Sequence, residues 1–263
     1  MQELLDARVP GTAEGAEAAR SRRRGLVVAA VAAVPFLAVA AAYRLFLTPD
    51  SPPRLQLTAR PVDAAPGVPA GQWSVGPDSV ADYRVREKLV KLPAPNDAVG
   101  RTSAVTGRFD LSPDPGGLRV ARGMQIVVDV STLKSDDDRR DTHIHSIALE
   151  SDTFPTATFV STEDLVLPAA TAATGGRADI VVKGDLTLHG VTSPVSIPLQ
   201  AQRSDIRIEV VGSFTFGWGQ FAMEQPQLSY VSVNDDPTFE FHLFFDPGTA
   251  RPAPTSTALP ENG

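Results

Sequence analysis

The stretch GDLTLHGVTSPVSIPL, residues 184–199, decides the fold. Apolar and polar residues alternate on both sides of a short polar segment, HGVTSP, which begins at His189. The apolar residues that share the inner face of the two runs are Leu186, Leu188, Val195, Ile197 and Leu199. Gly190 supplies the backbone angles that a tight turn requires. The stretch is therefore predicted to be a β-hairpin whose apolar faces both point to the interior.

The same alternation recurs along the chain. It is found in residues 101–111, 117–130, 177–188, 205–216 and 239–245. A period of two with one apolar face is typical of antiparallel sheets. Long strands joined by short turns, without alternating helices, predict an all-β barrel or sandwich.

Composition excludes several classes of protein. The chain has 263 residues and a net charge of −7, which argues against a nucleic-acid partner. It contains no cysteine, so disulfides, thiolate metal sites and catalytic thiols are excluded.

The N-terminal part has the pattern of a membrane-targeting segment. Residues 1–24 form a polar tail that ends in RSRRR, and residues 25–47 are almost entirely apolar. About 20 apolar residues suffice for a transmembrane helix, and the arginine cluster should remain cytoplasmic. We therefore expect a single-pass protein of the cell membrane with an extracytoplasmic C-terminal part. Cleavage as a signal peptide near Ala40 is the alternative, and the protein would then be secreted.

The remaining chain divides by composition into three parts. Residues 48–71 are rich in proline and are expected to be a linker. Residues 72–247 form the predicted barrel domain, and residues 248–263 resemble a disordered tail.

Four motifs, in the expected order, give the barrel domain a resemblance to a known family. The hairpin VKGDLTLHGVTSPV resembles the most characteristic segment of the YceI-like family, lipocalin-like proteins that bind polyisoprenoids. WSVGPDSVADYRVREKL, from Trp73, resembles the family's opening strand. FPTATF, from Phe154, resembles the segment after its central helical loop, and FTFGWGQFAMEQP with FEFHLFF resembles its closing region.

The resemblance implies an eight-stranded antiparallel barrel with an elongated apolar pore and a short helical loop. It also implies a noncatalytic protein that carries, stores or sequesters a long-chain isoprenoid or similar amphiphilic lipid at the cell envelope. There are two alternatives. One is a structural envelope barrel without ligand, and the other is an enzyme or accessory protein that acts on isoprenoid lipids. A homodimer that forms through the barrel surface is a further expectation.

Aromatic residues of the apolar faces are the candidates for lining the pore, because rings line slender apolar cavities well. The candidates are Phe159, Phe214, Phe216, Trp218 and Phe221. Ordinary core packing is the other interpretation for each of them. Arg139 and Arg140, in the segment SDDDRRD, are candidates for contact with a lipid head group. That segment is otherwise typical of a solvated helix start.

No motif indicates catalysis or a resident cofactor. The sequence lacks the hydrolase, zinc-protease, P-loop and dinucleotide-binding patterns. His143 and His145 have the alternate spacing of metal ligands on a strand. Their segment resembles a helical loop, in which such residues diverge, so no metal site is predicted.

Overall fold

The computed structural model describes residues 51–58, 68–89, 96–169, 176–204, 207–225, 227–228, 231–233 and 236–248. Its strands are β1 (Gly71–Val75), β2 (Val80–Leu89), β3 (Asn96–Thr102), β4 (Val105–Asp114), β5 (Gly117–Val120), β6 (Gln125–Asp129), β7 (Thr156–Ser161), β8 (Leu165–Pro168), β9 (Arg177–Leu188), β10 (Val191–Ser204), β11 (Arg207–Thr215), β12 (Gln227–Leu228), β13 (Val231–Val233) and β14 (Thr238–Pro247). The helical turns are η1 (Val130–Thr132), α2 (Asp138–His143), η2 (Ile144–Ala148) and η3 (Trp218–Phe221). The predicted membrane span and almost all of the predicted tail lie outside these residues.

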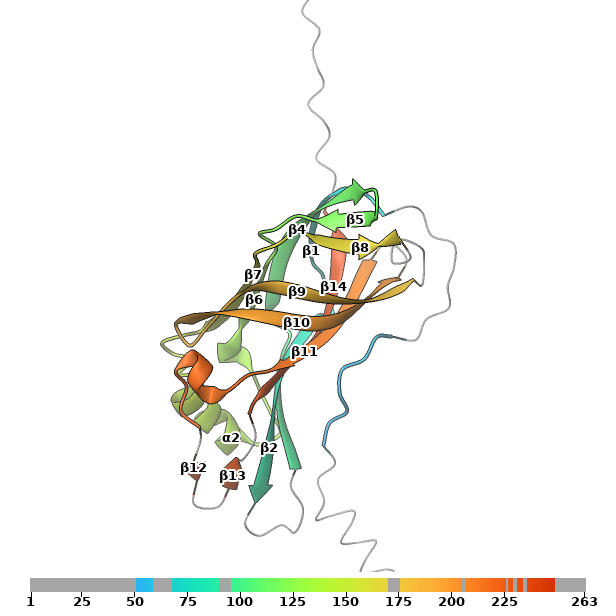
Figure 1. Ribbon diagram of the computed structural model, residues 1–263. Helices are drawn as coiled ribbons and strands as arrows, with labels where there is room; N and C mark the ends of the chain where they lie inside the picture. The colour runs from blue at the N-terminus through green and yellow to red at the C-terminus, as the bar shows by residue number, and fades with distance from the viewer. Residues whose placement is uncertain are drawn as a thin grey trace, which may run out of the picture. The chain divides into compact units, whose positions relative to one another are not determined.

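Within the described residues, eight strand positions close a barrel. Antiparallel neighbours follow one another in the order β14, β11, β10, β9, β7, β6, β4 and β1, and β1 pairs again with β14 (Figure 1). The predicted all-β, eight-stranded antiparallel barrel is confirmed. Every strand of the ring has two neighbours along at least part of its length, so closure removes most of the free sheet edge that an open sheet would expose.

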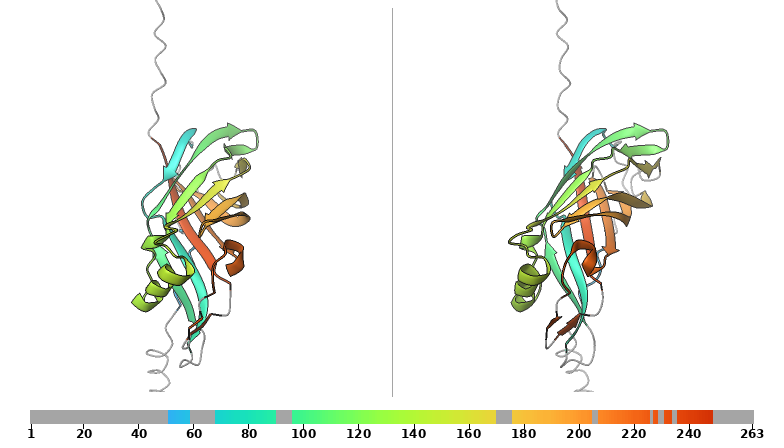
Figure 2. Two further views of the ribbon diagram at one scale, coloured as in Figure 1. Left: turned by 90° about the vertical axis from the view of Figure 1, so that its left-hand side faces the viewer. Right: turned by 60° about the vertical axis from the view of Figure 1, so that its left-hand side comes forward.

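One position in the barrel wall is occupied by two strands in succession, β1 in one half of the barrel and β2 in the other. β14 pairs with β1 through Phe245–Pro247 and with β2 through Thr238–His242. Between the two halves, the Ser79 hydroxyl donates to the Gly76 carbonyl and accepts from the Phe244 N–H. β2 and β3 then continue as a pair beyond the ring, beside α2 (Figure 2). We call this the helical end, and the opposite one, with the β4–β5 turn, the far end.

The β9–β10 turn is shorter than the sequence suggested. Only His189 and Gly190 lie outside the ladder, with φ values of +51° and +73°. Thr192, Ser193 and Pro194 belong to β10 and pair with β9, so the expected six-residue turn is wrong. Two residues with positive φ make a turn whose twist matches that of the flanking strands. The expected positive φ at Gly190 is confirmed.

The inner faces of the strands build two apolar clusters. The helical-end cluster contains residues such as Val130, Leu188 and Phe221, and the far-end cluster contains residues such as Trp73 and Leu111. Six partly buried residues pack against both clusters: Met124, Ile126, Val128, Leu165, Leu199 and Phe241. We call these six the waist of the barrel.

The predicted helix start in SDDDRRD is confirmed. The Asp137 carboxylate accepts hydrogen bonds from the Arg139 and Arg140 N–H groups and caps α2. These backbone hydrogen bonds, that from Arg139 above all, hold the pKa of Asp137 below its ordinary value.

No helix among the described residues combines the length and apolar character needed to cross a membrane. Residues 25–47, where the sequence predicts such a helix, lie outside the described ranges.

Candidate functional site: an apolar cavity in the barrel

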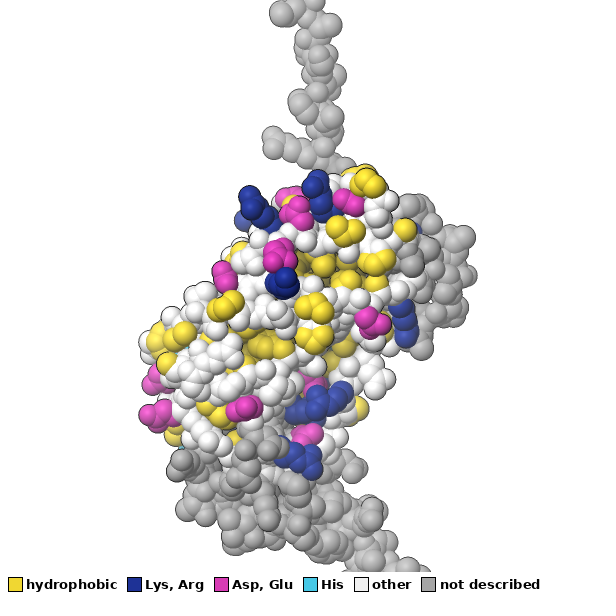
Figure 3. Space-filling view, in the orientation of Figure 1, with side chains coloured by type: hydrophobic (Ala, Val, Ile, Leu, Met, Phe, Trp, Pro, Cys, Tyr) yellow, Lys and Arg dark blue, Asp and Glu magenta, His cyan; other side chains and the backbone are white. Residues whose placement is uncertain are grey.

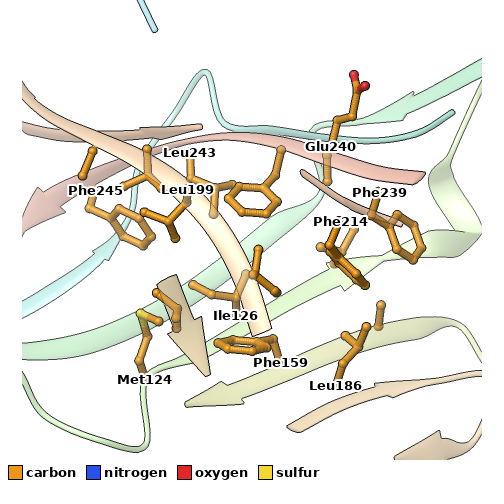
Figure 4. Close-up of a pocket in the computed structure, with 18 of the residues that line it drawn as sticks. Met124, Ile126, Phe159, Leu186, Leu199, Phe214, Phe239, Glu240, Leu243 and Phe245 are labelled. Carbon is orange, nitrogen blue, oxygen red and sulfur yellow. The ribbon is translucent and has the colours of Figure 1, made fainter. Parts of the chain in front are cut away.

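A cavity of about 140 Å³ lies inside the barrel. Side chains from β6, β7, β9, β11 and β14 point into it (Figure 4). Representative lining residues are Met124, Ile126, Phe159, Val182, Leu186, Leu199, Phe214, Phe239, Leu243 and Phe245. Apolar cavities of about 150 Å³ in other proteins stay free of water and take up small apolar molecules. The cavity therefore suits a slender hydrocarbon group rather than a polar metabolite.

Acidic side chains of the cavity wall point away from the interior. Glu240 forms part of the wall, but its carboxylate is directed outward (Figure 4). Asp82 lies opposite Glu240 in the ladder, and its carboxylate accepts two hydrogen bonds from the Arg101 guanidinium at 2.6 and 2.7 Å. The lumen is therefore apolar although charged residues build part of its wall.

Glycines on the inner faces give space to aromatic rings. A Cβ built on Gly212 would lie 2.9 Å from Cε2 of Phe241, which is directly opposite on β14. A Cβ on Gly184 would lie 2.5 Å from Cζ of Phe159. Real Cβ atoms do not approach other atoms so closely. The missing side chains thus allow both rings to lie back against the wall.

The sequence candidates for the pore occupy two places. Phe159 and Phe214 line the cavity. Phe216, Trp218 and Phe221 are buried in the helical-end cluster and are not among the lining residues. Whether any of the five contacts a ligand stays a prediction.

An aromatic group separates the cavity from the helical end. Phe239, which lines the cavity, lies 5.8 Å from Phe214 and 5.2 Å from Phe216 between ring centroids. Phe216 in turn contacts Phe221 edge-on at 5.2 Å. A chain that passed this end of the cavity would have to displace these rings.

The two head-group candidates differ in environment. Arg139 is exposed on α2. Arg140 is largely buried, and its guanidinium donates to Glu87 at 2.7 Å and also contacts Asp136. Burial opposes the charge of Arg140, but the hydrogen bonds and attraction to Glu87 and Asp136 raise its pKa above the ordinary value. Arg140 is therefore a fixed cation at the helical end.

Two further buried donors lie at the same end. Tyr83 and Trp218 belong to the helical-end cluster, and neither the Tyr83 hydroxyl nor Trp218 Nε1 has a hydrogen-bond partner among the described residues. Ser135 lies close enough to affect the pKa of Tyr83, but the two hydroxyls lack hydrogen-bond geometry. Burial raises the pKa of Tyr83, so the hydroxyl stays protonated. A buried donor without a partner is costly, which makes both groups candidates for contact with a polar ligand atom.

The histidines have structural partners. His145 contacts the Ser151 hydroxyl and the Leu133 carbonyl, each at 2.9 Å. His189 contacts the Phe221 carbonyl at 3.1 Å and Glu150 at 2.7 Å. Among the residues that the structure describes, no group of three or more potential ligands is placed to hold a metal.

Apolar side chains also gather on the outside of one wall. In the space-filling view they appear over β8 and β9, where Val166 is 44% and Val181 56% exposed (Figure 3). β9 pairs with β7 only from Gly184 to Thr187. In the described part of the chain, the rest of β9 has no strand partner on that side, which makes this the least closed part of the wall.

The sequence patterns did not identify most of the residues that line the cavity. Phe239, Phe241 and Met124 line it, yet none was a site candidate. Their inward faces were visible in the alternation, but alternation cannot separate a lining residue from a packed one. A stronger signal was present in Gly184 and Gly212, since glycine inside a strand often marks a close approach.

Comparison with known proteins agrees with the fold. The sequence pattern of the YceI-like domain matches residues 81–245. A UPF0312 protein of Vibrio cholerae is 33% identical over 123 residues, covering 44% of this chain and 56% of the relative. A UPF0312 protein of Shewanella baltica is 31% identical over 147 residues, covering 50% and 72%. The chain thus spans little more than half the length of the Vibrio relatives it matches.

Solved structures of similar shape are more distant in sequence. A polyisoprenoid-binding domain from Saccharophagus degradans is 18% identical, with a TM-score of 0.49, and the match covers 68% of this chain and 99% of that domain. BcnA of Burkholderia cenocepacia is 22% identical, with a TM-score of 0.45 and coverage of 63% and 95%.

Proposed function

Since the chain belongs to the YceI-like domain family, we propose that its barrel binds the hydrocarbon chain of an amphiphilic lipid without catalysis. A long-chain isoprenoid is the ligand class that the family resemblance favours. The observation that carries the proposal is the cavity inside the barrel, into which apolar side chains point. Each Å² of apolar ligand surface removed from water contributes about 25 cal/mol, so a lipid chain gains substantially by entering it.

The ligand's polar group is proposed to lie at the helical end, which requires the chain of the ligand to displace the rings of Phe214, Phe216 and Phe239. Arg140 supplies a positive charge there, and Tyr83 and Trp218 supply buried donors without a partner among the described residues. Arg139, exposed one residue earlier, is placed to contact a larger anionic group from solvent. Charge-assisted hydrogen bonds to a phosphate are roughly twice as strong as neutral ones.

The protein is proposed to act at the cell envelope. Residues 25–47 would serve as a membrane anchor and would leave the barrel outside the cytoplasm. In the alternative, cleavage near Ala40 releases the barrel. Either form would carry, store or sequester the lipid beyond the cytoplasm.

A structural barrel without ligand is the second candidate, and the small cavity favours it. To admit an isoprenoid, the side chains of the waist would have to move. Met124 is the residue best suited to do so, because the unbranched thioether fills irregular space and changes rotamer readily.

A matched pair of variants tests lipid binding. Val182 lines the cavity, whereas its neighbour Val181 is exposed on the outer face. The full chain would be purified in mild detergent, photolabelled with a polyprenyl probe, and extracted for mass spectrometry. We expect labelling of the parent and of Val181→Trp, and loss of labelling in Val182→Trp. A parent that takes up no probe and yields no lipid would leave the structural barrel as the function.

A further inference from the structure

Residues 51–58 form an ordered strap on the outer face of the barrel. The sequence analysis placed them in a linker, but they belong to the same compact unit as the strands. Thr58, the last residue of the strap, donates its N–H to Glu209 of β11 at 2.6 Å. Its carbonyl accepts a hydrogen bond from Gln202 of β10 at 2.9 Å. One end of the strap is therefore fixed to two neighbouring strands.

The rest of the strap crosses three more strands. Arg54 pairs with Glu240 of β14 at 2.5 Å. Arg84 of β2 pairs with the same carboxylate at 2.9 Å, and Ser51 donates its hydroxyl to the Asn96 side chain of β3 at 2.9 Å. The strands β3, β2, β14, β11 and β10 are consecutive neighbours in the sheet. The strap thus braces one side of the wall, across strands that ladder hydrogen bonds already join.

The other side of the wall contains a strand contact without a ladder. At the far end β8 lies beside β9 and pairs with β5 on its other edge (Figure 1). β9 pairs with β7 from Gly184 to Thr187, and the Lys183 carbonyl accepts from the Thr162 N–H at 3.1 Å. Beyond that point, no backbone hydrogen bond among the described residues joins β9 to β8. We call the contact between β8 and residues 177–182 of β9 the seam.

Both sides of the seam belong to the cavity wall. The lining residues are Leu165 and Leu167 of β8 and Ile180 and Val182 of β9. Leu165 and Ile180 pack against the far-end cluster, to which Leu167 belongs. Moving β8 away from β9 would disturb apolar packing but would break none of the described backbone hydrogen bonds. Separating two strands of the braced side would break a ladder of them. The seam is therefore the place where the wall yields most easily.

The cavity is too small for a long prenyl chain. Its volume is about 140 Å³. An apolar cavity of about 150 Å³ in another protein takes up benzene, so this one holds about one isoprene unit. A longer chain can enter the lumen only if the side chains of the waist move or the wall itself opens.

We propose that the barrel takes up a long prenyl chain by moving β8 away from β9, so that the seam determines the length of chain that the lumen accepts. The inference rests on the lipid binding of the proposed function. β8 moves together with β5, to which it stays paired, while the braced side keeps its shape. The hydrocarbon chain fills the space that opens between Leu167 and Ile180, so the apolar surface of both side chains stays covered.

Distance measurements with and without a guest test the movement. The chain has no cysteine, so Val166→Cys combined with Asp179→Cys places one spin label on each side of the seam. Both side chains are exposed and do not line the cavity. The labelled full chain, in mild detergent, would be measured alone, with geraniol, and with solanesol, a long prenyl alcohol. We expect solanesol to lengthen the distance between the labels and geraniol to leave it unchanged.

A second pair of cysteines gives the matched control. Thr187→Cys combined with Thr192→Cys labels residues that are directly opposite in the β9–β10 ladder. The distance between these labels should be the same in all samples, because ladder hydrogen bonds hold the two strands together.

Bridging the seam tests whether its opening is needed for binding. A bis-methanethiosulfonate reagent joins two thiols through disulfides, and a reductant removes it. With Val166→Cys and Asp179→Cys bridged, we expect photolabelling by a geranyl probe to persist and photolabelling by a solanesyl probe to be lost. Reduction should restore the labelling by the solanesyl probe. The bridged control pair should keep the labelling by both probes.

The possible outcomes separate the seam from lipid binding itself. An unchanged distance with solanesol, or full solanesyl labelling while the seam is bridged, overturns the inference and leaves the proposed function standing. Labelling of the parent by the geranyl probe alone shows a lumen that does not widen, which also overturns the inference. A parent that takes up neither probe overturns the proposed function and the inference together.

Discussion

The ring of Phe241 occupies the space that a side chain at Gly212 would need. The two residues are directly opposite on β14 and β11, and Phe241 lines the cavity. The absence of a side chain at Gly212 on β11 therefore determines how far the Phe241 ring on β14 projects into the lumen.

Adding a methyl group at this glycine should narrow the cavity. In Gly212→Ala the ring of Phe241 has to move inward, and overpacking of this kind costs about 1–3 kcal/mol. We expect lower uptake of the polyprenyl probe and a lower denaturation midpoint. Combining Gly212→Ala with Phe241→Leu should recover part of both losses. Strictly additive losses would show that the two residues are not coupled.

The β9–β10 turn should depend on Gly190 for two reasons. Its φ is +73°, and a Cβ there would lie 2.6 Å from the Phe154 ring. The backbone strain of a side chain at positive φ alone costs about 1–3 kcal/mol of folding stability. Gly190→Val should therefore lower the denaturation midpoint more than Gly123→Val. Gly123 also has a positive φ, but open space surrounds it, so this control isolates the steric contribution.

Arg140 and Arg139 should differ in their contribution to stability. Arg140→Ala leaves Glu87 buried without its ion pair, and breaking buried pairs costs about 3–5 kcal/mol. Arg139→Ala removes an exposed side chain and should change the unfolding free energy by less than about 0.5 kcal/mol. Denaturant titration of both variants measures the difference. Similar losses of unfolding free energy in the two variants would contradict a buried ion pair between Arg140 and Glu87.

The strap should make stability depend on pH in the acid range. Burial alone would raise the pKa of Glu209, but hydrogen bonds from Thr58, His242 and Gln202 hold it below its ordinary value of 4.5. A carboxylate with a depressed folded-state pKa stabilises the fold above the unfolded pKa, and the gain is lost as the pH falls through the folded pKa. We expect a fall in melting temperature below about pH 4.5 that is smaller in Thr58→Pro. An equal fall in both proteins would mean that Thr58 does not hold Glu209 ionised.

The strands were predictable from the sequence because their pattern is local. Alternation at residues 177–188 and 239–245 assigns the inner face without knowledge of any partner. The turn at His189 was overestimated, since Ser193 and Pro194 look like turn residues but are held in register by β9. Tertiary pairing outweighed local preference there.

The strap and the buried donors could not be predicted in the same way. Residues 51–58 show no period, and their order depends on Glu209 and Glu240, which lie more than 150 positions later in the chain. The Tyr83 hydroxyl is distinguished only by a lack of partners among the described residues, which a sequence does not display. Such features arise from long-range packing, not from local propensity.

The waist divides the barrel into two cores, and the lumen is the gap between them. Stability is carried mainly by the end clusters, around residues such as Trp73 and Phe221, which are 1% and 0% exposed. The cavity is lined by the waist and also by members of both clusters, such as Val182 and Phe245. Exchanges at the waist can therefore change the fit to a guest molecule without removing a fully buried side chain from either core. Replacing Met124 or Leu199 by another apolar residue would let the same barrel accommodate lipid chains of a different width.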